Sequence, residues 1–182
     1  MRPKGGDQRF ERLILPHLDA AHDLARWLMR DGAAAQEAVQ EAYLRAFRYF
    51  DSFHGEDGRA WVLGIVRNTC YSLLGETPPP GSFEEFDESL HVESVDAIAG
   101  PEGAAMAKEA RALVHDAVAA LPAEFRETVV LRELHGLSYR EIAVATDAPI
   151  GTVMSRLARG RDRKSTRLNS SHSQQSRMPS SA

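Results

Sequence analysis

The chain of 182 residues is long enough for one ordinary domain or two small ones, and its 43% apolar content is normal for a protein that buries a core. No apolar run approaches the roughly 18 to 20 residues of a membrane span, and the N-terminal MRPKGGDQRF lacks the apolar segment of a secretory signal. We therefore expect a cytoplasmic protein with no membrane partner. The single Cys70 can form no internal disulfide, has no neighbouring Cys or suitably spaced His for a metal site, and is expected in or beside the core.

The formal net charge of −4 is unevenly distributed. Residues 1–75 hold ten basic and ten acidic groups, 76–105 none and eight, 106–163 nine and eight, and 164–182 three and none. The excess negative charge therefore lies in the middle of the chain. This pattern excludes a globally basic DNA-binding protein, but it leaves room for a basic face on one element.

The N-terminal part has the apolar periodicity of helices. A first helix is predicted to end near Asp31-Gly32, because apolar residues recur at spacings of four and three at Ile14, Leu18, Ala21, Ala25 and Leu28. A second is predicted over about 34–50 and a third over about 59–74, separated by the loop FDSFHGEDG. We expect a three-helix bundle over residues 7–75.

Residues 76–105 are predicted to be a flexible acidic linker. TPPPG at 77–81 blocks helix formation and favours polyproline II, and the carboxylates that follow repel one another. We expect an extended, solvated tether between two small domains, and an all-α chain overall.

The C-terminal part, residues 106–163, has clear helix boundaries. Pro122 suits the first turn of a helix that ends at His135-Gly136. Ser138 and Glu141 have the spacing of a capping box, which predicts a short helix from Tyr139 to Ala145. After the turn, Asp147 can cap and Pro149 can open a helix that runs to about Arg163. A short helix, a tight turn and a second helix form the helix-turn-helix pattern.

The second helix of this pattern has two distinct sides on a helical wheel. Val153 and Leu157 share the side that packs on the domain, and small polar and arginine side chains occupy the opposite side. Such side chains suit the major groove, where arginine pairs with guanine or neutralises phosphate. The outward group comprises Thr152, Met154, Ser155, Arg156, Ala158 and Arg159. The alternative is a solvated basic face, which the preceding capped helix and turn make the weaker interpretation.

Two long segments resemble one family. LPAEFRETVVLRELHGLSYREIAVATDAPIGTVMSRLARGR (121–161) is similar to the fourth conserved region of the sigma-70 family, in its extracytoplasmic-function (ECF) branch. FERLILPHLDAAHDLARWL, QEAVQEAYLRAF and RAWVLGIVRNTCYSLL resemble its second region, in order and at the usual spacing. The resemblance implies a bacterial transcription initiation factor that binds core RNA polymerase, at the β′ clamp coiled coil and the β subunit, and promoter DNA.

The resemblance also assigns roles to residues of the N-terminal part. It places polymerase docking on the helix that holds Gln36, Glu37, Gln40, Glu41 and Arg45. The family usually has an acidic residue at position 36, so Gln36 removes one charge there. Recognition and melting of the minus-ten element are placed on Phe53, His54, Arg59, Trp61, Arg67 and Asn68. Aromatic and amide side chains in a cationic groove can hold an unstacked base. Trp61 fits a core position as well, whereas Arg67 and Asn68 are expected on a face away from the core.

For the minus-thirty-five element, the resemblance implies contacts from Thr152, Met154, Ser155, Arg156 and Arg159. The family frequently has Lys or Arg where this chain has Met154, and a thioether cannot reproduce a charged hydrogen bond. We therefore expect a different base preference at that position. The resemblance leaves open an anti-sigma partner, and the promoter sequence is not deducible.

No pattern for an enzyme, a cofactor or a small-molecule substrate is present in the sequence. His17 and His22 are five apart, whereas two metal ligands on one helical face need a spacing of three or four. The acidic run has no feature that would separate the pKa values of two carboxyls, and there is no glycine-rich phosphate loop or nucleophile elbow. The alternatives to a sigma factor are a stand-alone helix-turn-helix regulator and a non-functional remnant.

Residues 164–182 differ in character from the helix before them. They hold seven serines and no acidic residue, with Leu168 and Met178 as the only large apolar side chains. We expect them to be disordered, because they cannot bury a core. Our hypothesis is that STRLNSSHSQQSRMPSSA is a non-native extension joined after the reading helix.

Overall fold

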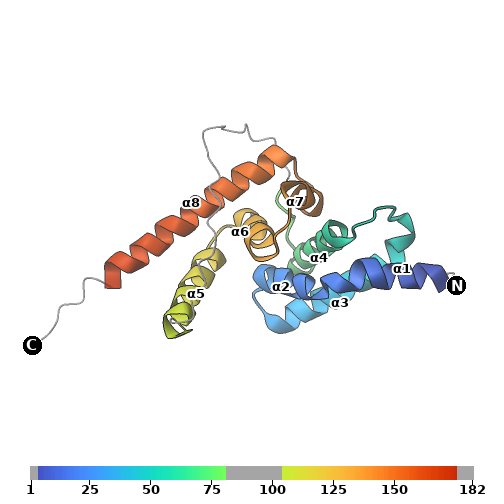
Figure 1. Cartoon of the computed structure of the whole chain (residues 1–182), viewed down its shortest axis with the longest axis horizontal. Coiled ribbons are helices and arrows are strands. Elements are labelled where there is room, and N and C mark those ends of the chain that lie inside the picture. Colours follow the sequence, from blue (N-terminus) through green and yellow to red (C-terminus); the bar gives the residue numbers. More distant parts are fainter. Residues whose placement is uncertain (1–3, 81–103, 176–182) are drawn as a thin grey trace, which may run out of the picture.

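The computed structural model describes residues 4–80 and 104–175, with side chains described for 6–80 and 108–170. Within these ranges every regular element is a helix, which confirms the all-α prediction. Figure 1 shows an N-terminal group, α1 to α4, beside a C-terminal group in which α6 and α7 lie between that group and the long α8. The acidic run of the predicted linker, residues 81–103, and the last seven residues lie outside the described residues.

The N-terminal group comprises α1 (Lys4–Ile14), a 3-10 turn (Leu15–His17), α2 (Leu18–Met29), α3 (Gly32–Tyr49), a second 3-10 turn (Phe50–Ser52) and α4 (Arg59–Leu74). The prediction of one helix spanning Ile14 to Leu28 was wrong, because the 3-10 turn interrupts it. Pro16 lies in that turn and has no amide hydrogen to donate to the carbonyl four residues earlier.

The helices α2, α3 and α4 pack against one another as the predicted bundle, and α1 adds to it. Leu24, Val39 and Leu63 are buried at its centre. Asp31 caps α3 by accepting a hydrogen bond from the Ala34 amide at 2.7 Å. The bounds of α4 are those predicted, and it ends at Gly75, whose φ of 68° suits glycine.

The C-terminal group comprises α5 (Ala104–Ala119), α6 (Ala123–Val129), a π-helical turn (Val130–Leu134), α7 (Tyr139–Thr146) and α8 (Ile150–Gln175). The capping box is confirmed. The Ser138 amide donates to Glu141 Oε2 at 2.6 Å, and the Glu141 amide donates to Ser138 Oγ at 3.2 Å. Asp147 does not cap the next helix as expected; it ends α7 with a left-handed φ of 50°.

The predicted end of the last helix at Arg163 was wrong, since α8 continues to Gln175. Glu133 accepts hydrogen bonds from Arg161 Nε at 2.9 Å and Lys164 Nζ at 2.5 Å. Burial alone would raise the pKa of Glu133, but the hydrogen bonds and positive charges of Lys164 and Arg161 together lower it. Extending an existing helix requires no new nucleation, so α8 can continue past Arg163.

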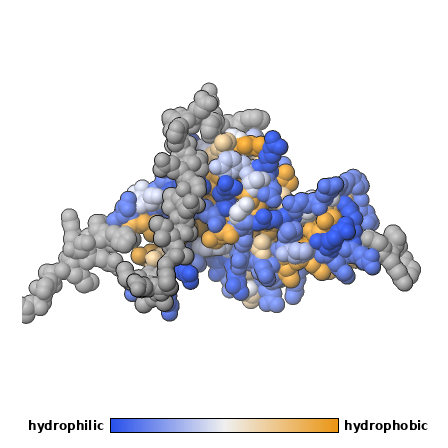
Figure 2. Space-filling view, viewed as in Figure 1, coloured by the Kyte–Doolittle hydropathy of each residue, from blue (hydrophilic) through white to orange (hydrophobic). Residues whose placement is uncertain are grey.

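The two groups are in contact rather than held apart. Helix α4 packs on α7, and α2 packs on α6. Gly64 permits the close approach of α4 and α7, because a Cβ on Gly64 would lie 3.2 Å from the Ala145 carbonyl oxygen. On the face shown in Figure 2, polar residues predominate and apolar residues form small patches between them.

Candidate functional site

The residues assigned to polymerase docking lie along one accessible face of α3. Gln36, Glu37 and Gln40 are exposed. Glu41 and Arg45 are partly exposed and form an ion pair, with Arg45 Nε 2.8 Å from Glu41 Oε1. This face of the helix therefore presents carboxylate and amide groups to solvent.

Apolar side chains extend this face, and the sequence prediction missed them. Leu44 and Tyr49 are 63% and 58% exposed, and Phe47 is also exposed. Leu44 and Phe47 line a pocket of about 530 Å³ together with Asp7 of α1. The sequence could have indicated this apolar surface, because these residues fall outside the inward-facing positions of α3. Exposed large apolar side chains often mark interaction sites.

The loop before α4 holds an aromatic cluster. The ring of Phe53 is buried, with its centroid 4.8 Å from that of Trp61 and 6.0 Å from that of Phe50. Arg9 lies over the Phe50 ring at 5.0 Å and donates to the Phe53 carbonyl at 3.0 Å. Phe53 is thus a core residue in this arrangement, Trp61 is half-buried, and His54 is exposed.

The α4 residues assigned to the minus-ten element lie partly at the contact between the two groups. Arg59 donates a hydrogen bond to the carbonyl of His135. Arg67 was expected on an open face, but its side chain is only 2% exposed and points at α6. Asn68 is exposed and accepts from Arg67 Nη1 at 3.3 Å. The face of α4 that the isolated bundle leaves open is covered by the C-terminal group.

Glu127 of α6 is the partner of Arg67 and was not singled out by the sequence. Arg67 donates from Nε to Oε2 at 2.8 Å and from Nη2 to Oε1 at 2.9 Å, so the pair is bidentate. The Tyr71 hydroxyl donates to Oε2 at 3.0 Å, and its pKa is raised by burial and by the Glu127 charge. The helical spacing was the available signal, because Glu127 lies three and four residues before the apolar Val130 and Leu131 and so shares their side of the helix.

The predicted reading face of α8 is largely covered. Thr152, Ser155 and Arg156 are 1%, 6% and 5% exposed, whereas Arg159 is exposed and Met154 half-buried. The expectation of an outward face was therefore wrong for the first three. Arg156 Nη2 donates to the Pro80 carbonyl at 2.6 Å. A helical wheel treats one helix alone and cannot include contacts from another part of the chain. The inward positions of Val153 and Leu157 are confirmed.

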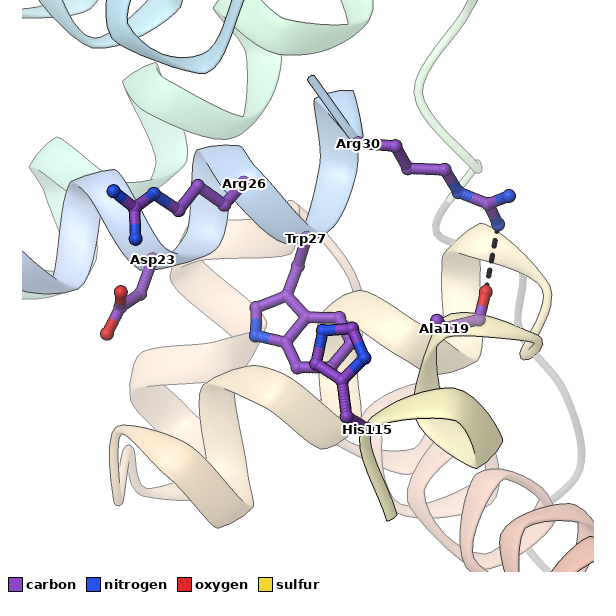
Figure 3. Close-up of a pocket in the computed structure, with 6 residues that line it drawn as sticks. All are labelled: Asp23, Arg26, Trp27, Arg30, His115 and Ala119. Atoms are coloured by element: carbon purple, nitrogen blue, oxygen red, sulfur yellow. Dashed lines mark hydrogen bonds between the residues drawn. The ribbon is translucent and has the colours of Figure 1, made fainter. Parts of the chain in front are cut away.

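A second contact between the groups joins α2 to α5 (Figure 3). The Trp27 ring faces the His115 imidazole with centroids 4.6 Å apart, and Arg30 donates to the Ala119 carbonyl at 2.9 Å. These residues line a pocket of about 430 Å³. Arg126 of α6 adds a hydrogen bond to the Trp27 carbonyl at 3.1 Å.

The described residues include no group of three His, Cys, Asp or Glu side chains placed to hold a metal ion. In the same part of the chain, no helix is both long and apolar enough to cross a membrane. Cys70 is buried, as predicted, and burial raises the pKa of its thiol to about 12.

Comparison with known proteins matches both groups to one family. A family described as "Sigma-70 region 2" matches residues 13–76, and one described as "Sigma-70, region 4" matches residues 111–163. The ECF RNA polymerase sigma-E factor of Escherichia coli (strain K12) is 34% identical over 165 residues, which cover 87% of this chain and 86% of that protein. The RNA polymerase sigma-H factor of Pseudomonas aeruginosa is 34% identical over 170 residues, covering 88% and 87%.

Solved structures agree. The sigma factor RpoE from Bartonella quintana, in complex with the anti-sigma factor NepR, matches with a TM-score of 0.64 and 26% identity over 88% of this chain and 96% of that chain. CnrH, in complex with the cytosolic domain of CnrY, shares the fold with a TM-score of 0.62 and 22% identity, over 88% of each chain. Members of this family are initiation factors and not enzymes. The chain belongs to the ECF branch of the sigma-70 family and is a promoter-recognising sigma factor of RNA polymerase.

Proposed function

We propose that this chain brings core RNA polymerase to promoters through three separate surfaces. The α3 face docks on the β′ clamp coiled coil, the loop and α4 hold the minus-ten element, and α8 reads the minus-thirty-five element. The observation that carries the proposal is the accessible face of α3, where Glu37, Gln40 and Glu41 lie in line beside exposed apolar residues. A DNA-binding regulator acting alone has no use for such a face.

The α4 surface suits DNA opening more than duplex reading. An unstacked base needs an aromatic platform and hydrogen-bonding groups nearby. Trp61 is half-buried, His54 is exposed in the adjoining loop, and Asn68 is exposed on α4. Phe53 supports Trp61 from within the aromatic cluster. The chain supplies binding only, and we propose that it has no catalytic activity of its own.

An anti-sigma factor is the further partner that we propose. The support is the similar sigma factor RpoE, whose structure contains the anti-sigma factor NepR. We place the action of the chain in the cytoplasm, because core polymerase and promoters are found there. Affinity capture with the purified chain, with and without excess core polymerase, tests for the anti-sigma partner. Core polymerase should displace an anti-sigma factor but not an unrelated contaminant.

The decisive experiment is multi-round transcription with purified core polymerase on a library of candidate promoters. We expect initiation at a defined subset of promoters that core polymerase alone does not use. The stand-alone regulator makes the opposite prediction. Binding of the chain alone to a palindromic operator, without promoter-specific initiation, would sink the sigma assignment.

A further inference from the structure

The strongest polar contact between the N-terminal and C-terminal groups is the pair of Arg67 and Glu127. Both side chains are buried, at 2% and 0% exposure, and they meet through two hydrogen bonds of 2.8 and 2.9 Å. Tyr71 adds a third hydrogen bond to the same carboxylate at 3.0 Å. Arg67 and Tyr71 belong to α4 and Glu127 to α6, so the cluster closes only when the two groups are packed together.

Buried pairs of this kind contribute specificity more than net stability. The desolvation cost of the two charges offsets much of their attraction. Removing one partner, however, leaves the other buried without a counter-charge, which typically shifts the equilibrium by roughly a hundredfold or more. The packed arrangement of the two groups is therefore sensitive to the charge of Glu127.

Two of the arginines assigned to DNA, Arg67 and Arg156, donate hydrogen bonds to acceptors of the chain itself. Arg67 is held by Glu127, and its Nη2 lies 3.4 Å from the Pro79 carbonyl oxygen. Arg156 of α8 donates to the next carbonyl along the chain, that of Pro80. A carboxylate with two oxygens presents to an arginine much the same acceptor geometry as a phosphate does.

We propose that Glu127 is a latch. Its carboxylate accepts the hydrogen bonds of Arg67 that a DNA phosphate would otherwise accept. It thereby holds the two groups in a closed form in which Arg67 cannot contact DNA. Opening separates α4 from α6 and α7 and frees Arg67. The proposal rests on the assignment of Arg67 to DNA contact, and goes beyond it by naming the internal group that competes with DNA.

Two variants open the latch by different means. Glu127→Gln removes the counter-charge, and Glu124→Gln on the same helix is its control, with the same change in net charge. Gly64→Leu adds a side chain where even a Cβ lies 3.2 Å from the Ala145 carbonyl oxygen, so it wedges α4 from α7 without changing any charge. Leucine favours helix over glycine, so the N-terminal bundle retains α4 in this variant.

Opening is measured first, without DNA or polymerase. Cysteines at Ala33 and Arg140, which are exposed on α3 and α7, receive a donor and an acceptor dye. Cys70 stays unlabelled because it is buried and its pKa is raised to about 12. We expect energy transfer to change in Glu127→Gln and in Gly64→Leu, and to remain at the wild-type value in Glu124→Gln.

DNA binding is then measured by anisotropy with a labelled random-sequence single strand of about 20 nucleotides, because phosphate and stacking contacts tolerate sequence. We expect both opening variants to bind at least about tenfold more tightly, since affinity scales with the open fraction. One extra phosphate contact should steepen the salt dependence by about 0.7 in log–log slope. Arg67→Gln combined with Gly64→Leu leaves Glu127 unpaired and keeps the wedge between α4 and α7, so it should open without this gain.

The outcomes separate the latch from the sigma function. Unchanged energy transfer in both variants would overturn the latch, as would opening with no gain in DNA affinity, or an equal gain in the double variant lacking Arg67. None of these measurements uses polymerase. If wild-type chain fails to direct initiation on any promoter, the proposed function fails even where the latch is found.

Discussion

The surface that we propose for polymerase docking and the surfaces that we propose for DNA differ in their accessibility. The α3 face proposed for docking is open to solvent, and among the described residues α3 packs mainly on α2 and α4 of its own group. Of the residues assigned to DNA, Arg67, Thr152, Ser155 and Arg156 are buried. We expect Arg67 and Arg156 to contact DNA only after a rearrangement, because both arginines are hydrogen-bonded to acceptors within the chain.

The physical reason lies in where each surface is placed. The α3 residues are on the side of the bundle away from the C-terminal group, so water satisfies their polar atoms. Arg67 is buried at the contact between the two groups, so its hydrogen-bond acceptors come from the chain itself. An arginine placed there is either held by Glu127 or free for DNA, but not both.

The largest expected effect is on the open surface. Reversing two charges with Glu37→Lys and Glu41→Lys should weaken binding to core polymerase by a hundredfold or more, because like charges across an interface cost several kcal/mol. Binding is measured by co-purification and by fluorescence titration, with the fold checked by circular dichroism. The control is Glu109→Lys with Asp116→Lys on exposed positions of α5. Undiminished binding would refute the docking assignment.

A smaller effect is expected on the covered surface. Arg156→Gln should reduce initiation by polymerase at its promoters about 5- to 150-fold, since an arginine that contacts DNA typically contributes about 1–3 kcal/mol. Docking on core polymerase should stay at the wild-type level. Initiation rates and core binding are measured on the same preparation. Arg111→Gln, on exposed α5, is the matched control, and equal losses in both variants would remove the reading role of Arg156.

Lowering the pH should weaken the contact between the N-terminal and C-terminal groups, where Arg59 meets the His135 carbonyl, and should leave the docking face of α3 unchanged. Burial lowers the pKa of His135 below its ordinary value of 6.5, with Asp23 acting the other way and Arg59 adding to the shift. Among the described residues, its Nε2 has no hydrogen-bond partner. The unfolded chain therefore protonates His135 at a higher pH than the folded chain does. The contribution of neutral His135 to the free energy of unfolding is fully present above pH 6.5 and is lost as the pH falls through the folded-state pKa.

The measurement is urea unfolding at several pH values between about 5 and 8. We expect the free energy of unfolding to fall on acidification, and to fall less in His135→Asn, which cannot take up the proton. The same slope in wild type and variant would show that other groups are responsible.

The smallest effect is expected at the end of α8. Deleting residues 165–182 retains Arg161 and Lys164, which carry the contacts to Glu133. The free energy of unfolding should change by less than about 1 kcal/mol, as for most surface changes. Promoter-specific initiation should be unchanged. A clear loss of either would mean that the helical extension after Arg163 belongs to the working protein.

The sequence by itself determined the elements and the family. Apolar periodicity and the Ser138–Glu141 capping box located α4 and α7 to within a residue, because these signals act over a few neighbouring positions. Resemblance across two ordered segments identified the sigma factor. The buried positions of Val153, Leu157 and Cys70 followed from the same local rules.

Only the tertiary structure decided which assigned residues are accessible. Helical periodicity placed Arg67, Ser155 and Arg156 outward, whereas all three are buried. Glu127 and the Pro79 carbonyl accept hydrogen bonds from Arg67, and the Pro80 carbonyl accepts one from Arg156. Glu133, far away in sequence, accepts a hydrogen bond from Lys164 just past the predicted end of α8. Periodicity describes one helix at a time, whereas burial of a charge depends on the acceptor that another helix brings to it.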